Sequence, residues 1–134
     1  MLVLDNTILS DYLAGVDTAR GFLQQYEQEV WAVSSIALYE AYIGCAHGYI
    51  EATPEMVKQA ITASMTLVDV TPQTAAEAEV MQRELLELGI PADSPDILIA
   101  AAAREHGGTF ATADKHFWKP EMESVFSVAK YDPY

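Results

Sequence analysis

The sequence predicts an α/β fold built on a parallel sheet that helices cover on both faces. Short apolar segments alternate with longer helix-like segments along the whole chain. Helices of this length between strands exclude hairpins and require crossover connections between parallel strands. The apolar segments are also continuous, which is typical of strands that are buried on both faces.

One strand and two helices are expected before residue 30. Residues 2–4 are apolar and lead into Asp5; Asn6 or Thr7 then caps a helix that Gly15 ends. Asp17 or Thr18 caps the second helix. Apolar residues recur at helical spacing in both segments: Ile8, Leu9, Tyr12, Leu13, Phe22, Leu23 and Tyr26.

Two strands and two helices are expected in the middle of the chain. Residues 30–33 form a strand, after which Ser34 and Ser35 cap a helix from Ile36 to about Ala46. Thr53-Pro54 starts the next helix, because proline is favoured at the first helical position. Residues 66–70 then form another strand.

The same proline signal starts the last two helices. Thr71-Pro72 opens a helix that runs to Leu88, with Gly89 as its stop. Ser94-Pro95 opens a helix that carries Asp96–Glu105 and ends at Gly107-Gly108. The remaining strands are expected at residues 109–112 and 125–129, the second of these at an edge of the sheet.

Composition predicts one globular domain over residues 1–134. Half of the residues (51%) are hydrophobic, which is enough for a core. No apolar run approaches the roughly 18 residues of a membrane span, and the first residues lack the basic segment of a signal peptide. Cys45 is the only cysteine, which excludes an internal disulfide. We therefore expect a soluble cytoplasmic protein without membrane contact.

The net charge of −13, from 7 basic and 20 acidic residues, has two interpretations. The chain is either an acidic partner-binding protein or a protein adapted to a very salty cytoplasm. We favour the second, because the acids are scattered along the chain instead of forming a tail. At about 1 M salt the Debye length falls to about 3 Å, so the charge does not exclude a nucleic-acid substrate.

Acidic residues occur where a parallel α/β sheet binds its ligands, at the carboxyl ends of its strands. Asp5 follows the first strand, and Asp114 follows the strand at 109–112. Asp96 lies in the first turn of an almost wholly apolar helix, and Glu40 lies in the middle of another. Clustered carboxylates repel one another, and only Lys115 is near any of them in sequence. A divalent cation such as Mg²⁺ is the simplest partner for them.

A structural role is the alternative for each acid taken alone. An aspartate after a strand often caps a helix, and Asp96 gains from the helix dipole. Glu40 is the hardest to explain in this way, because a residue in mid-helix caps nothing. The convergence of all four acids at one predicted edge is the feature that indicates a site.

The motifs that surround these acids resemble those of the PIN domain. They are Leu4-Asp5-Asn6-Thr7-Ile8-Leu9, Ser35 with Glu40, Asp96 followed by Ile97-Leu98-Ile99 and four alanines, and Gly108-Thr109-Phe110-Ala111-Thr112-Ala113-Asp114. The resemblance covers essentially the whole chain. In size the chain is similar to the stand-alone VapC toxin ribonucleases of VapBC toxin–antitoxin pairs.

The resemblance implies a three-layer α/β/α fold and an endoribonuclease that depends on Mg²⁺ or Mn²⁺. Asp5, Glu40, Asp96 and Asp114 would be its catalytic and metal-binding acids, supported by Thr112, Asn6 and Asp93. A homodimer and a cognate antitoxin are further implied partners. The chain departs from the family where His116 replaces a common acid, where Asn6 rather than threonine follows the first aspartate, and where Asp93 is an extra acid.

Other functions are possible for such a chain. A PIN-like fold could serve as a non-catalytic protein-binding module, or as a housekeeping RNA-processing nuclease. A phosphoacceptor receiver domain fits poorly, because Asp69 is expected inside its strand, and a phosphatase would need an acid two residues after Asp5.

Several other residues carry expectations of their own. Phe117 and Trp118 could stack an RNA base or anchor a loop, and Lys115 and Lys119 could touch phosphates. Cys45 is expected to be a buried free thiol. The remaining expectations are structural: His47 and His106 near helix C-termini, His116 at the surface, and Tyr39, Tyr42 and Tyr49 in the core or an interface.

Overall fold

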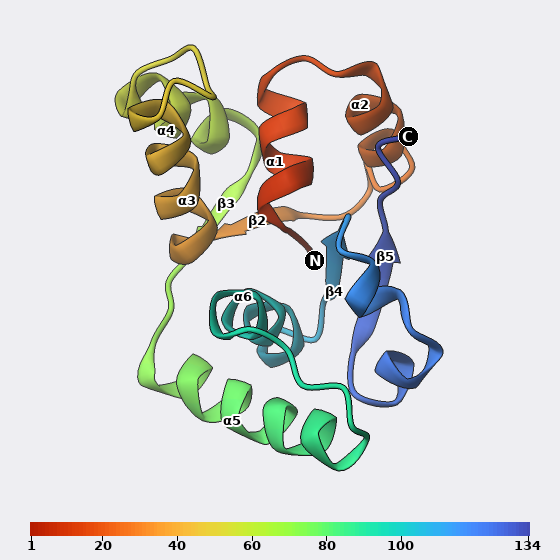
Figure 1. Cartoon of the computed structure of the whole chain (residues 1–134). Coiled ribbons are helices and arrows are strands. Elements are labelled where there is room, and N and C mark those ends of the chain that lie inside the picture. Colours follow the sequence, from red (N-terminus) through yellow and green to blue (C-terminus); the bar gives the residue numbers. More distant parts are fainter.

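Five parallel strands form the central sheet of the computed structural model, which describes residues 1–134 (Figure 1). The strands are β1 (Leu2–Leu4), β2 (Trp31–Ser34), β3 (Thr66–Val68), β4 (Thr109–Thr112) and β5 (Ser127–Lys130). Their order across the sheet is β3-β2-β1-β4-β5, and every neighbouring pair is parallel. The predicted parallel sheet is confirmed, with the last strand at an edge.

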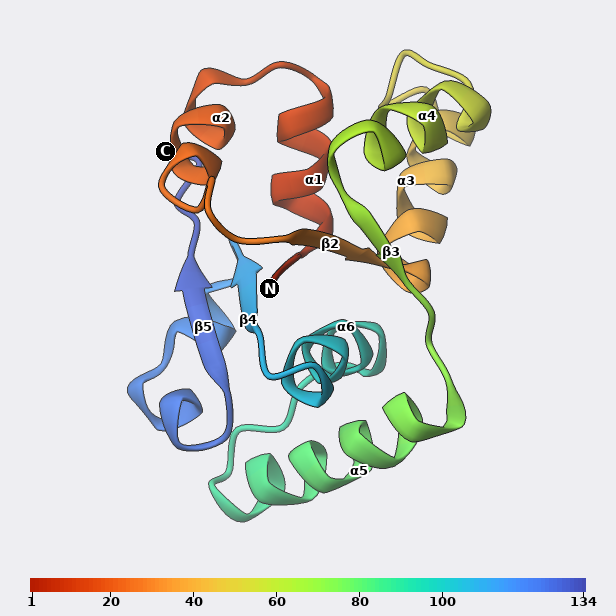
Figure 2. The ribbon, with the colours of Figure 1, turned by 180° about the vertical axis from the view of Figure 1, so that it is seen from behind.

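Helices cover both faces of this sheet (Figures 1 and 2). One face carries α1 (Asn6–Leu13), α2 (Asp17–Gln24), α3 (Ser35–Ala46) and α4 (Pro54–Ser64), and the other carries α5 (Pro72–Glu87) and α6 (Ser94–Glu105). Two short 3₁₀ helices, η1 (Lys115–Trp118) and η2 (Pro120–Ser124), lead from β4 to β5. The three-layer α/β/α architecture is therefore confirmed.

The buried helix α6 explains the run of alanines in the sequence. It packs against β1 and β4 on one side and against α5 on the other. Ile99–Ala103 are at most 1% exposed. Small side chains let the helix approach its neighbours closely, and the position of α6 brings its first turn to the carboxyl ends of the central strands.

The direction in which strands are added to the sheet reverses between β1 and β4. The chain adds β2 and then β3 on one side of β1 and returns to place β4 on the other side. Ligands of open α/β sheets bind at such a switch point, outside the carboxyl ends of the strands. Asp5 directly follows β1, and Asp114 lies two residues beyond the end of β4.

Most helix starts agree with the sequence prediction. The hydroxyl of Ser34 accepts from the Ala37 amide at 3.2 Å, and Thr53 accepts from Met56 at the same distance. Thr71 forms a capping box, in which its hydroxyl and that of Thr74 each accept from the other's backbone amide.

The predicted caps of the first two helices are wrong. Asp5 caps α1, because its carboxylate accepts from the Asn6 amide at 2.7 Å; Asn6 and Thr7 already belong to the helix. Helix α2 starts at Asp17 without a side-chain cap and ends before Tyr26. A cap needs an acceptor with extended backbone before the first turn, and at α2 that position is held by Val16.

Three strands start or end away from their predicted bounds. Pairing with β1, β2 and β4, respectively, places the strands at 31–34, 66–68 and 127–130 instead of 30–33, 66–70 and 125–129. Asp69 therefore follows β3 and does not lie inside it, contrary to the prediction. A receiver-like site is still not formed, because no second acid adjoins Asp5 and β3 is an edge strand.

None of the helices is both long enough and apolar enough to span a lipid bilayer.

Candidate metal centre

Asp5 is the most buried acid of the site, with 7% of the residue exposed. One carboxylate oxygen accepts from the Asn6 amide, and the other accepts from the Thr112 hydroxyl, both at 2.7 Å. Burial raises the pKa of Asp5, these hydrogen bonds work in the opposite direction, and the nearby charge of Asp114 raises the pKa further. The fold thus holds a carboxylate at a place that disfavours its charge.

Thr112 connects the ends of β1 and β4 through a single hydroxyl. It is fully buried at the last position of β4. Its Oγ1 donates to Asp5 and accepts from the Asp114 amide at 3.0 Å. This one side chain therefore orients Asp5 and fixes the turn that carries Asp114.

Asp96 enters from the opposite layer, in the first turn of α6. Burial, followed by the charges of Asp5, Asp114 and Asp93, raises the pKa of Asp96 to about 6, and the charge of His116 partly offsets this rise. Such a shift means that the carboxylate lies within range of several like charges and is poorly solvated.

Glu40 completes the group from the middle of α3. Burial and then the charges of Asp5 and Asp96 raise the pKa of Glu40. Its Oε1 is buried and has no hydrogen-bond partner. Glu40 therefore lies within range of the charges of Asp5 and Asp96, and both of these lie within range of the charge of Asp114.

None of the four acids forms an ion pair. The ion pairs of the chain join the N-terminus to Glu29, Arg83 to Glu79, Arg104 to Glu77 and Glu84, and His106 to Glu105. None of them includes an acid of the candidate site. Asp5 is buried, Glu40 and Asp96 are half-buried and Asp114 is exposed, and a poorly solvated carboxylate without an ion-pair partner favours a ligand of opposite charge.

The chemistry of these donors fits a hard divalent cation. All are carboxylate oxygens, and one of them, Glu40 Oε1, is buried without a partner. No three acidic, histidine or cysteine side chains form a preformed coordination group. Mg²⁺ does not require one, because it is commonly held by one or two carboxylates and keeps several waters.

The supporting residues have distinct positions. Asn6 contributes its backbone amide to Asp5, and its side-chain oxygen lies 3.5 Å from the Ser10 hydroxyl. Asp93 is exposed at the cap position of α6, makes no capping hydrogen bond, and raises the pKa of Asp96 by its charge. Asp93 therefore adds negative potential at the rim of the site.

Sequence reasoning missed the part that His116 plays. Its backbone amide donates to Asp114 Oδ1 at 2.9 Å, while its ring Nε2 lies 2.9 Å from the Pro91 carbonyl oxygen. The ring is partly buried and fastens the turn after β4 to the segment that precedes α6. The one sequence signal for this contact between His116 and Pro91 is the position of a histidine two residues after Asp114.

Phe117 anchors a loop and is not available to stack a base. It is 1% exposed and packs edge-on against Phe110 and Phe126. Trp118 donates its indole N–H to the Thr112 carbonyl oxygen at 3.0 Å. The anchoring interpretation is thus the correct one for Phe117, while Lys115 and Lys119 are exposed.

Expectations for the remaining singled-out residues are met in part. His47 and His106 occupy the C-cap positions of α3 and α6, as predicted. Cys45 is free but only partly buried, and it packs against the core. Tyr39 and Tyr49 are 61% and 83% exposed, so they do not belong to the core, and the alternative, a place in an interface, stays a prediction.

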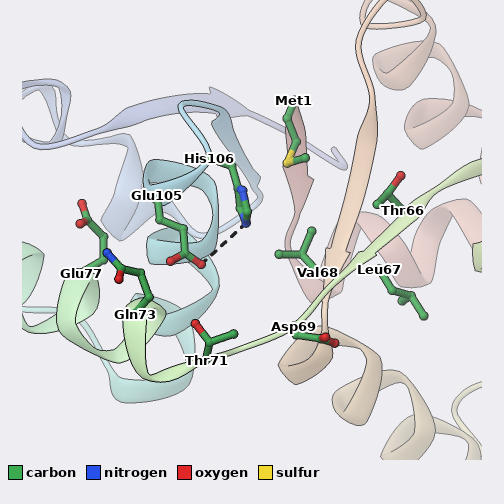
Figure 3. A pocket seen from close by; sticks show the side chains of 10 residues that line it. All are labelled: Met1, Thr66, Leu67, Val68, Asp69, Thr71, Gln73, Glu77, Glu105 and His106. Carbon is green, nitrogen blue, oxygen red and sulfur yellow. Dashed lines mark ion pairs between the residues drawn. The ribbon is translucent and has the colours of Figure 1, made fainter.

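A cavity of about 580 Å³ lies away from the acidic group, between β3 and helices α5 and α6 (Figure 3). Met1 and His106, which line it, precede β1 and β4 and so mark the amino ends of these strands. Two of its three acids already have partners: Glu105 accepts from Thr74 at 2.6 Å, and Glu77 pairs with Arg104 at 2.8 Å, while Asp69 is exposed. This cavity therefore lacks the group of mutually repelling carboxylates of the candidate metal centre.

The sequence profile of the PIN domain family matches residues 2–121, which is most of the chain. The chain belongs to the PIN domain family. Among curated proteins, none matches the sequence. The family assignment confirms the resemblance that the sequence motifs indicated.

Solved structures share this PIN fold over nearly their whole length. VapBC2 from Rickettsia felis, bound to a promoter DNA fragment, has a TM-score of 0.78 at 19% identity and covers 98% of both chains. FitAcB from Neisseria gonorrhoeae has a TM-score of 0.74 at 20% identity, with 99% of this chain and 98% of that chain covered. A toxin–antitoxin complex from Klebsiella pneumoniae has a TM-score of 0.72 at 21% identity, covering 100% and 98%.

Proposed function

We propose that this PIN domain is a metal-dependent endoribonuclease in which Asp5, Glu40, Asp96 and Asp114 hold Mg²⁺ or Mn²⁺. One observation carries the proposal: like charges of the group raise the pKa of Asp5, Glu40 and Asp96, and none of the four acids is in an ion pair. Membership of a family whose proteins are generally nucleases supports it.

The residues have separate tasks in the proposed reaction. A bound divalent cation supplies charge neutralisation at the cleaved phosphate and lowers the pKa of water. Asp5, Asp96 and Asp114 hold the cation, directly or through water, and Thr112 keeps Asp5 in orientation. Glu40 joins them or accepts a hydrogen bond from the attacking water through its unpartnered oxygen.

The proposed products are a 5′-phosphate and a 3′-hydroxyl, because water attacks the phosphorus in line and the RNA 2′-hydroxyl takes no part. Because the chain has few basic residues, the cation is expected to neutralise most of the charge of the phosphate. Cleavage is therefore expected to stop completely when EDTA removes divalent ions and to return when Mg²⁺ or Mn²⁺ is restored.

We further propose that the chain acts as the toxin of a type II toxin–antitoxin pair, working as a homodimer. The likeness of fold to structures named as toxin–antitoxin complexes supports this role. An antitoxin arginine that reaches the carboxylates would compete with the cation by charge pairing. Co-expression with the product of a short neighbouring gene should yield a complex in which RNA cleavage is suppressed.

The test uses total RNA and the variant Asp5→Asn, which keeps the size of the side chain and removes its charge. Wild-type protein with Mg²⁺ or Mn²⁺ should cut RNA, and Asp5→Asn should lose at least about 100-fold of the rate, the loss expected when a metal ligand and its charge are removed. Asp69→Asn is the matched control, because Asp69 is exposed after an edge strand. Equal cleavage by wild type and Asp5→Asn would refute the proposed site.

The rival role, a non-catalytic binding module, gives a different result. Such a protein would be stabilised by Mg²⁺ or Mn²⁺ in thermal unfolding but would leave every RNA intact.

Sequencing of RNA ends after induction in cells separates the toxin from a housekeeping nuclease, because a toxin cuts few sites and arrests growth.

A further inference from the structure

A cavity of about 400 Å³ opens beside the candidate metal centre. Asn6 from α1 and Glu40 from α3 line it, so it is continuous with the acidic group. Its other walls come from the rest of α3 and from the segment that follows α3. The volume lies within the range of about 300–1,000 Å³ that small-ligand sites occupy.

Aromatic rings line this cavity. Tyr39 and Tyr49 line it with 61% and 83% of their surface exposed. The rings of His47 and Tyr49 are stacked, with centroids 5.6 Å apart and an angle of 24° between their planes. The exposed ring of Tyr39, and the face of the Tyr49 ring that His47 does not cover, are available for a flat ligand.

The charge of the cavity selects which part of a nucleic acid can enter it. No lysine or arginine lines it, and Glu40 is its one acid. A phosphate would meet only repulsion there, whereas an uncharged base would not. Bases stack on aromatic side chains irrespective of their sequence, and proteins bind RNA by splaying its unpaired bases in this way.

The lining also favours a base over a protein helix. Four of the nine lining residues are hydrophobic, two of them Tyr39 and Tyr49, and Asn6 and Ser10 offer an amide and a hydroxyl that can meet the polar edge of a base. A docked helix would require a more continuous apolar surface, which the adjoining cavity of about 680 Å³ provides with eight hydrophobic residues among its twelve. The cavity therefore combines ring faces for stacking with polar groups for the edge, next to the acids proposed to hold the metal.

We propose that this cavity binds an unpaired base of the substrate RNA, adjacent to the bond that is cut, against the rings of Tyr39 and Tyr49. The inference rests on the proposed nuclease function and names its substrate as single-stranded RNA. It also explains how a chain with a net charge of −13 binds a polyanion, since stacking needs no phosphate attraction.

Kinetics with Tyr39→Leu and Tyr49→Leu test the proposal, and Tyr39→Phe and Tyr49→Phe are the controls. The leucine variants should raise KM for a short unpaired RNA about tenfold and leave kcat within about twofold, the effect of removing one stacking ring. The phenylalanine variants should behave as wild type. An unchanged KM in both leucine variants would overturn the inference.

A series of substrates that lack one base at a time identifies the ligand directly. Removing the base that occupies the cavity should raise the wild-type KM as much as the leucine substitution does. The leucine variant should then show no further loss with that substrate. If removal of the base and the leucine substitution each raise KM by their full amount when combined, the base lies elsewhere, and the inference is contradicted.

Binding without cleavage separates this inference from the nuclease proposal. Fluorescence anisotropy measures the binding of a labelled RNA to each variant. EDTA in the buffer prevents cleavage, and about 1 M KCl screens the charge of the carboxylates. Weaker binding by the leucine variants, with normal binding by the phenylalanine variants, supports the inference even if the wild type cuts nothing. Unaltered RNA binding together with a changed sedimentation mass would assign the surface to a second copy of the chain and overturn the inference.

Discussion

Single hydrogen bonds decide how the acids of this PIN domain are held. The Thr112 hydroxyl serves two partners at once, as donor to Asp5 and acceptor from the Asp114 amide. Because the residue is fully buried, water cannot replace either bond after the hydroxyl is lost. The site therefore depends on a residue that bears no charge.

Thr112→Val should lower both stability and activity, while Thr112→Ser should preserve them. Loss of the hydroxyl leaves Asp5 and the Asp114 amide short of partners, at a cost of about 1–3 kcal/mol in the free energy of unfolding. Urea unfolding and RNA cleavage measure the two effects. A valine variant as stable and as active as the serine variant would contradict this role of Thr112.

The acids also make stability depend on pH. The folded-state pKa of Asp96, about 6, exceeds its ordinary value of 3.8, so the folded chain binds more protons than the unfolded chain between these values. Without metal, the free energy of unfolding should therefore rise as pH falls from 7.5 to 5. Calorimetry should show this rise in Tm, and Asp96→Asn should weaken it and raise the Tm at pH 7.5. A Tm that falls as the pH falls from 7.5 to 5 would show that the pKa of Asp96 is not raised in the folded chain.

At the scale of elements, close approach between neighbouring segments limits substitution. A Cβ added to Gly108 would lie 2.5 Å from the Met1 carbonyl oxygen, which accepts from the Thr109 amide at the start of β4. Gly21 is a matched contrast, because it lies inside α2 with nothing within 4 Å of an added Cβ.

Gly108→Ala should destabilise the fold by more than about 1 kcal/mol, since backbone must move. Gly21→Ala should instead stabilise it by about 0.5–1 kcal/mol, because alanine favours a helix more than glycine does. Chemical unfolding of both variants gives the comparison. Equal effects at the two positions would show that the contact with Met1 does not limit the packing of β1 against β4.

Sequence patterns predicted the helices and strands well where a local signal decides them. The proline starts at Pro54, Pro72 and Pro95 and the serine cap of α3 depend on neighbouring residues alone. The strand bounds depend on pairing between distant segments, such as Leu2 with Trp31, which no local pattern contains. The cap of α1 was missed because Asp5 serves as cap and site acid together.

The candidate site was predictable to a similar extent. The acids could be named because each follows a strand or interrupts an apolar helix, and parallel topology brings those places together. The link from His116 to Pro91 and the exposed rings of Tyr39 and Tyr49 could not be predicted. They depend on how loops fold back on the domain, which hydrophobic periodicity does not report.

For the whole molecule, the net charge of −13 should make stability increase with salt. Repulsion among 20 acids weakens as the Debye length shortens to about 3 Å near 1 M. Thermal unfolding in KCl from 0.05 to about 2 M should show a steady rise in Tm, as the interpretation of a salty cytoplasm requires. A flat or falling Tm would favour the acidic partner-binding interpretation.

Direct titration of Mn²⁺, followed by electron paramagnetic resonance at pH 7.5, tests most directly whether the facing carboxylates hold a cation. Wild-type protein should bind Mn²⁺ in competition with Mg²⁺, and both Asp5→Asn and Asp96→Asn should lose that binding while remaining folded. Asp69→Asn should bind as wild type does. Equal Mn²⁺ binding by wild type and the two site variants would contradict the account, because the cation would then be held elsewhere on the acidic surface.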